Sequence, residues 1–146
     1  MFQSVDAHFL VSPQITVADI GKAAALGVKL VVNNRPEGES PDQTPGEDIA
    51  AAAAAAGMAY VAIPVTHSGF SHGQIDALQA ALAESGDAPV LAYCRSGTRS
   101  TLLWALTMAR GGMAPDDIAA KAAGAGYDIA PIRPTVDMLA AARSDR

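Results

Sequence analysis

The residues best suited to chemistry lie in one short segment, Cys94-Arg95-Ser96-Gly97-Thr98-Arg99-Ser100, which contains the chain's only cysteine. An apolar run at 89–93 precedes this segment, and a helical pattern starts at Thr101. A strand, a short loop and a helix in this order direct backbone N–H groups and the positive helix end toward the thiol. We therefore expect Cys94 to be an ionised, reactive cysteine with an anion-binding site beside it.

The other residues of this segment fit the same chemistry. Gly97 allows a tight turn and the close approach of an anion. Arg99 can hold two oxygens of a tetrahedral anion with its planar guanidinium, and its charge favours the thiolate. Arg95 either adds charge or points to solvent, and further hydroxyl groups come from Ser96, Thr98 and Ser100. The alternative interpretation is a buried structural cysteine at a strand end, because free cysteines are often buried.

The composition predicts one compact domain over residues 1–146. Half of the residues are hydrophobic and 17% are charged, which excludes a disordered chain. The net charge is −5 and the basic residues are scattered, so nucleic acid is not an expected partner. No apolar run is long enough to span a bilayer. The start of the chain lacks the pattern of a secretory leader, so we expect a cytoplasmic protein without membrane attachment.

The cysteine and histidine positions argue against a metal site. A single cysteine cannot form an internal disulfide, which fits a reducing compartment. The three histidines, at positions 8, 67 and 72, show none of the close spacings typical of zinc ligands. We expect neither a metal nor a cofactor.

Short apolar runs alternate with helical patterns along the chain, and this alternation predicts an α/β fold with a mostly parallel sheet. The expected strands are 8–11, 28–33, 58–63 and 90–93, and the expected helices are 17–26, 47–56, 74–85, 101–110, 115–123 and 135–142. Ligands usually bind beyond the carboxyl ends of parallel strands. The loops after residues 33, 63 and 93 are therefore expected to converge.

The loop at 35–46 is long and contains three prolines and two glycines. Long loops in compact domains are often functional. Asn34, Arg35 and Glu37 are accordingly candidates for lining the site. A solvated connector with a charged rim is an equally good interpretation.

Four segments carry a resemblance to a known family: 11–14, 63–65, 91–100, and the run Val32-Asn33-Asn34-Arg35-Pro36-Glu37-Gly38-Glu39. They resemble the phosphatase-like domain of the beta-lactamase hydrolase-like family, whose members are also described as sulfur transferases or phosphatases. The resemblance implies a fold like that of dual-specificity tyrosine phosphatases, in which helices flank a mostly parallel sheet.

Two features depart from that phosphatase pattern. Phosphatases of this fold have five residues between the cysteine and the arginine, whereas only four separate Cys94 from Arg99. Four intervening residues resemble the active loop of rhodanese-type sulfurtransferases. Similar phosphatases also take a general acid from an aspartate in the loop after the third strand, and no aspartate occurs here before Asp76. His67 or His72 is either a substitute acid or a solvated loop histidine.

Three hypotheses follow for the function. The first is a sulfurtransferase that forms a persulfide on Cys94 from thiosulfate or a persulfide donor. The alternative is a cysteine-dependent phosphatase that acts on a phosphate ester through a thiophosphate intermediate. The third is a non-catalytic module that binds an anion or senses oxidants. In each case the expected partner is small and anionic, and the sequence identifies no protein partner.

Overall fold

One five-stranded sheet forms the centre of the molecule. The computed structural model describes residues 1–144 of the chain. The strands lie in the order β1-β2-β5-β3-β4, and only β1 is antiparallel to its neighbour. Their bounds are β1 Gln3–Asp6, β2 Phe9–Ser12, β3 Leu30–Asn33, β4 Ala59–Ala62 and β5 Val90–Tyr93. The predicted α/β fold with a mostly parallel sheet is confirmed.

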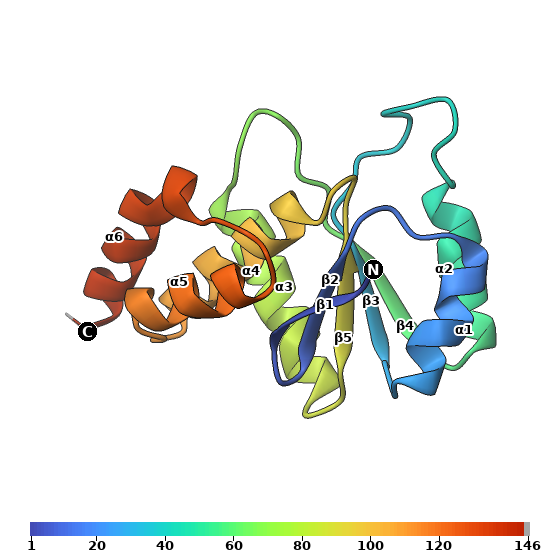
Figure 1. Cartoon of the computed structure of the whole chain (residues 1–146), viewed down its shortest axis with the longest axis horizontal. Helices are drawn as coiled ribbons and strands as arrows, with labels where there is room; N and C mark the ends of the chain where they lie inside the picture. Colours follow the sequence, from blue (N-terminus) through green and yellow to red (C-terminus); the bar gives the residue numbers. More distant parts are fainter. Residues whose placement is uncertain (145–146) are drawn as a thin grey trace.

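Helices cover both faces of the sheet (Figure 1). Helices α1 and α2 lie on one face, α3 and α4 lie on the other, and α5 and α6 pack around α4. The bounds are α1 Val17–Ala25, α2 Gly46–Ala55, α3 His72–Ser85, α4 Thr98–Arg110, α5 Pro115–Gly124 and α6 Arg133–Ser144, with a 3-10 turn, η1, at Ala130–Ile132.

Alternating side chains of the central strands supply two separate hydrophobic cores. Val31 and Leu91 face α1 and α2, where they pack with Ile49. Val32 and Ala92, one position further along the same strands, belong to the core beneath α3 and α4. This period of two is the normal consequence of a pleated strand that is buried on both faces.

Strand β1 and several helix starts differ from the sequence-based expectation. Strand β1 was not predicted, because only Val5 of its four residues is buried and its pattern carries no amphipathic signal. Helix α3 begins at His72 rather than Gln74, since Ser71 and Gln74 form a capping box. Helix α4 begins three residues before Thr101, and this earlier start brings Arg99 into its first turn.

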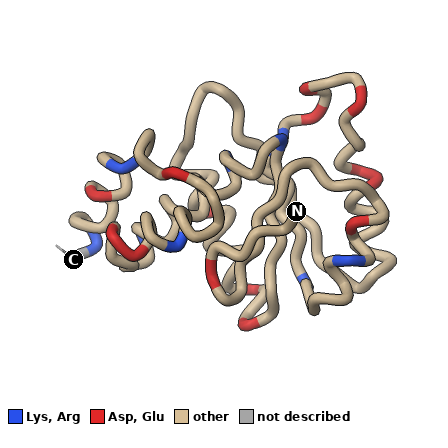
Figure 2. Tube along the Cα trace, in the orientation of Figure 1, with Lys and Arg blue, Asp and Glu red and all other residues tan. Residues whose placement is uncertain are grey.

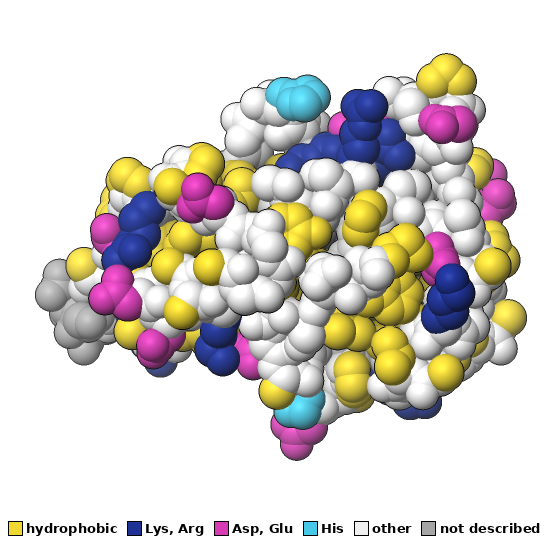
Figure 3. Space-filling view, viewed as in Figure 1, with side chains coloured by type: hydrophobic (Ala, Val, Ile, Leu, Met, Phe, Trp, Pro, Cys, Tyr) yellow, Lys and Arg dark blue, Asp and Glu magenta, His cyan; other side chains and the backbone are white. Residues whose placement is uncertain are grey.

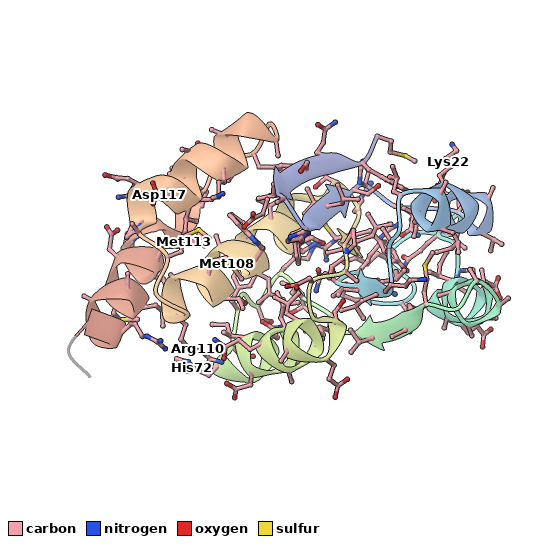
Figure 4. The ribbon with its side chains drawn as sticks, turned by 90° about the horizontal axis from the view of Figure 1, so that it is seen from below. Lys22, His72, Met108, Arg110, Met113 and Asp117 are labelled. Carbon is pink, nitrogen blue, oxygen red and sulfur yellow. The ribbon has the colours of Figure 1, made fainter. Side chains whose placement is uncertain are left out.

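The end of α4 is tied to its neighbours by polar and apolar contacts. Arg110 donates to Asp76 and Gln79 of α3, both at 2.5 Å. Met108 and Met113, which are labelled in Figure 4, are partly buried and pack against the core near this end of α4.

Candidate active site

Cys94 lies at the corner between β5 and α4. Its side chain is fully buried, and its backbone N–H donates to the carbonyl of Ser12 at 3.4 Å. The N–H of Gly97 donates to the Cys94 Sγ at 3.1 Å. Gly97 has a φ of +90°, a left-handed conformation that glycine adopts without strain, and it is the N-cap of α4. The sulfur therefore accepts a backbone hydrogen bond next to the positive end of a helix.

Three loops meet at Arg99, as expected from the parallel strands. Its Nη1 donates to the carbonyl of Val65 at 2.7 Å in the β4–α3 loop. Nη1 and Nη2 also donate to Oε2 and Oε1 of Glu39 in the β3–α2 loop, both at 2.8 Å. Figure 2 shows the basic positions at this edge of the sheet beside the acidic positions of the β3–α2 loop. In Figure 3 the basic side chains fill the space between the two raised loops.

Glu39 is held by two arginines. Besides the two bonds from Arg99, its Oε1 accepts from the Nε of Arg35 at 2.9 Å. The hydrogen bonds from Arg99 above all, and then those from Arg35, lower the pKa of Glu39 to about 2 despite partial burial. In turn, Glu39 and the charge on Cys94 raise the pKa of Arg99. Glu39 is thus a fixed anion at neutral pH.

The structure places the predicted accessory residues in different roles. Arg35 is buried, with only 4% of its side chain exposed, and it also donates to Gln14 and Ser40. Asn34 is buried too, and its Nδ2 donates to the carbonyl of Ile63 at 2.9 Å, so it links the ends of β3 and β4. His67 is exposed in the β4–α3 loop. Arg35 and Asn34 shape the edge of the sheet, whereas no described contact involves His67.

The remaining loop residues divide between surface and interior. Arg95 is exposed. Ser96 and Thr98 are exposed as well, and the hydroxyl of Ser96 donates to that of Thr98 at 3.0 Å. Ser100 is buried, and its hydroxyl has no hydrogen-bond partner within residues 1–144.

Two residues at the site were not predicted from the sequence. Glu39 was noted only as part of the family resemblance, although it is the carboxylate that binds Arg99. Tyr127 follows α5, and its hydroxyl donates to the carbonyl of Ser96 at 3.0 Å. No sequence signal connects position 127 with position 96, because the contact depends on how the carboxyl-terminal helices pack.

Residues 1–144 carry neither a cluster of metal-ligand side chains nor a helix that could span a membrane. Among these residues, no group of three or more His, Cys, Asp or Glu side chains could hold a metal ion. Within the same residues, every helix is too short or too polar to cross a membrane.

A mostly parallel sheet with helices on both faces is the fold of the tyrosine-phosphatase-like class of proteins. The chain belongs to the family described as "Beta-lactamase hydrolase-like protein, phosphatase-like domain", which matches residues 1–111. Curated relatives with the name beta-lactamase hydrolase-like protein include those of Agrobacterium fabrum, 36% identical over 102 residues, and Xylella fastidiosa, 35% identical over 127 residues. The matches cover 70% and 86% of this chain but only 23% and 29% of those relatives.

Solved structures agree with this class. A provisionally assigned phosphatase from Neisseria meningitidis is 34% identical, with a TM-score of 0.80 over 94% of this chain and 96% of that chain. TpbA from P. aeruginosa, solved with phosphotyrosine, has a TM-score of 0.64 over 97% of this chain and 88% of that chain. At 17% identity, TpbA supports the fold alone.

Proposed function

We propose that this domain is a cysteine-dependent phosphatase in which Cys94 is the nucleophile and Arg99 binds the phosphoryl oxygens. The observation that carries the proposal is the corner between β5 and α4, where the Gly97 N–H lies 3.1 Å from the sulfur and Arg99 follows in the first helical turn. The family match and the 34% identical Neisseria structure favour phosphate chemistry over sulfur transfer. This reverses the order of the first two hypotheses from the sequence.

The reaction has two steps. The Cys94 thiolate attacks phosphorus, so that an S–P bond forms, the ester P–O bond breaks and the alcohol or phenol leaves. Water then attacks the thiophosphate, which breaks the S–P bond and releases inorganic phosphate and the thiolate. Arg99 and the loop amides stabilise the charge on the phosphoryl oxygens in both steps. The unpartnered hydroxyl of Ser100 supports the departure of the sulfur in the second step.

The carboxyl group that contacts Arg99 is not a proton donor for the leaving group. Glu39 is the carboxyl group beside Arg99, and with a pKa of about 2 it carries no proton at neutral pH. The β4–α3 loop contains one histidine, His67, but no aspartate or glutamate. We therefore expect efficient turnover only of aryl phosphates, whose phenolate leaves without help, and slow turnover of alkyl phosphates.

The test is the hydrolysis of p-nitrophenyl phosphate and phosphotyrosine by the purified chain. Cys94→Ser removes the nucleophile and Arg99→Lys removes the planar guanidinium, so each variant is expected to lose at least about a hundred-fold in kcat/KM. Arg110→Lys changes the same residue type at the other end of α4 and is the matched control. Equal turnover by wild-type protein and Cys94→Ser would refute the proposal.

Sulfur transfer is the second candidate, and two observations favour it. Only four residues separate Cys94 from Arg99, and the β4–α3 loop lacks an acidic residue. Thiosulfate needs no protonated leaving group, because sulfite departs as an anion. Incubation with thiosulfate and cyanide would then yield thiocyanate with the wild-type protein and none with Cys94→Ser. Thiocyanate formation without aryl phosphate turnover would put this second candidate first.

A further inference from the structure

Tyr127 contacts the catalytic loop from a part of the chain that the family match does not include. It lies between α5 and η1, beyond residue 111, and its hydroxyl donates to the carbonyl oxygen of Ser96 at 3.0 Å. The ring is only partly exposed. A single side chain from the carboxyl-terminal helices therefore reaches the backbone of the loop that carries Cys94.

The peptide group that Tyr127 contacts is the one that also contacts the sulfur. The Ser96 carbonyl and the Gly97 N–H belong to the same planar unit, and in a trans peptide they point in opposite directions. The carbonyl accepts from Tyr127, while the N–H donates to Cys94 Sγ at 3.1 Å. A hydrogen bond to the carbonyl fixes the plane of the peptide and also strengthens its N–H as a donor.

Gly97 provides independent evidence that the two groups are closely fitted. A Cβ at position 97 would lie 2.1 Å from the Tyr127 hydroxyl oxygen and 2.9 Å from the ring carbon that bears it. The residue also has a φ of +90°, which places its N–H toward the sulfur. Tyr127 therefore sits directly against the turn that orients the amide.

We infer that Tyr127 is a positioning residue for Cys94: its hydroxyl holds the Ser96–Gly97 peptide so that the Gly97 N–H stabilises the thiolate. This inference rests on the proposed role of Cys94 as the nucleophile. Burial, and then the charge on Cys94, raise the pKa of Tyr127, so its hydroxyl stays protonated and remains a donor at neutral pH. Arg99 of the same loop also interacts with the sulfur electrostatically, and Glu39 lies behind Arg99.

The experiment measures how fast iodoacetamide alkylates Cys94 as a function of pH, in the full chain and two variants. Tyr127→Phe keeps the ring and removes only the hydroxyl. Tyr60→Phe is the matched control, because its hydroxyl accepts from Asn33 and not from the catalytic loop. The loss of one hydrogen bond is expected to move the midpoint of the alkylation curve upward by roughly 0.5–1 pH unit in Tyr127→Phe, with no change in Tyr60→Phe.

Kinetic and thermal-unfolding measurements distinguish a role of Tyr127 in positioning the catalytic loop from a role in packing alone. Tyr127→Phe is expected to lower kcat for p-nitrophenyl phosphate about three- to ten-fold while KM changes less than two-fold. An unchanged alkylation midpoint in Tyr127→Phe, with or without a lower Tm, would overturn the inference. Alkylation requires no turnover, so a wild-type protein that hydrolyses no phosphate ester would contradict the proposed function and leave this test intact.

Discussion

At the scale of single residues, the pair of Arg99 and Glu39 decides how the site is preorganised. Glu39 occupies Nη1 and Nη2 of the guanidinium, with 18% of each side chain exposed. Arg35 holds the same carboxylate from the interior.

The sequence indicates Cys94 and Arg99, because a strand–loop–helix pattern surrounds them. It does not single out Glu39, because the partner of a loop carboxylate is fixed only when separate loops converge.

Glu39→Gln should weaken catalysis without removing any group that contacts the substrate. The amide has one acceptor oxygen where the carboxylate has two, so Arg99 loses one of its two hydrogen bonds to this side chain and also the ion pair. We expect kcat/KM for p-nitrophenyl phosphate to fall about ten-fold. Glu47→Gln, at an exposed position in α2, is the control and should match the wild-type protein.

The low pKa of Glu39 also predicts a pH dependence of stability. A folded-state pKa of about 2 lies below the ordinary value of 4.5, so the ionised pair stabilises the fold above pH 4.5. The shift corresponds to about 3 kcal/mol, which is lost as the pH falls from 4.5 toward 2. Urea unfolding at pH 6.5 and 3 measures it. The stability difference between wild-type protein and Glu39→Gln should shrink at the lower pH, and a constant difference would contradict this origin.

At the scale of elements, the geometry of the turn from β5 into α4 matters most, because this turn orients the Gly97 N–H and Arg99. The sequence predicts the strand, the loop and the helix, and it predicts that three loops converge. It places the start of α4 three residues late, because Thr98, Arg99 and Ser100 are polar and Gly97 in a left-handed conformation is the true N-cap. Polar residues at a helix start resemble a loop in sequence, and only the contacts of the first turn distinguish the two.

Gly97→Ala is expected to disrupt this turn. The new Cβ would meet the Tyr127 hydroxyl at 2.1 Å, and the φ of +90° is unfavourable for alanine. We expect a loss of about 1–3 kcal/mol in the free energy of unfolding and at least a hundred-fold loss in kcat/KM. Gly73→Ala, inside α3 with no neighbour closer than 3.8 Å, should instead be neutral or stabilising by up to about 1 kcal/mol. Similar behaviour of the two variants would rule out a special role for the turn.

At the scale of the whole molecule, two cores share one sheet. Ile49 belongs to the core under α1 and α2, and Ile118 of α5 belongs to the core under α3 and α4. Both side chains are fully buried. The sequence predicts most strands and helices from their apolar patterns, but not β1, which is half exposed, nor the contact of Tyr127 with the active loop. Both depend on which segments become neighbours in the folded chain.

If residues 1–146 form one folding domain, as we expect, damage to either core should lower the same unfolding transition. Ile49→Ala and Ile118→Ala are each expected to cost about 2–5 kcal/mol. Circular dichroism and tryptophan fluorescence should report one common midpoint, since Trp104 lies in the core that contains Ile118. Two separate transitions in the Ile49→Ala protein would show that the faces unfold independently.

The most direct test of the account is mass spectrometry of the protein quenched with acid during turnover of p-nitrophenyl phosphate. Cys94 should gain one phosphoryl group, and Ser100→Ala should accumulate more of this species because breakdown of the S–P bond is slower. No adduct on Cys94 under turnover, or a gain of a single sulfur atom with thiosulfate and none with the phosphate ester, would contradict the phosphatase assignment.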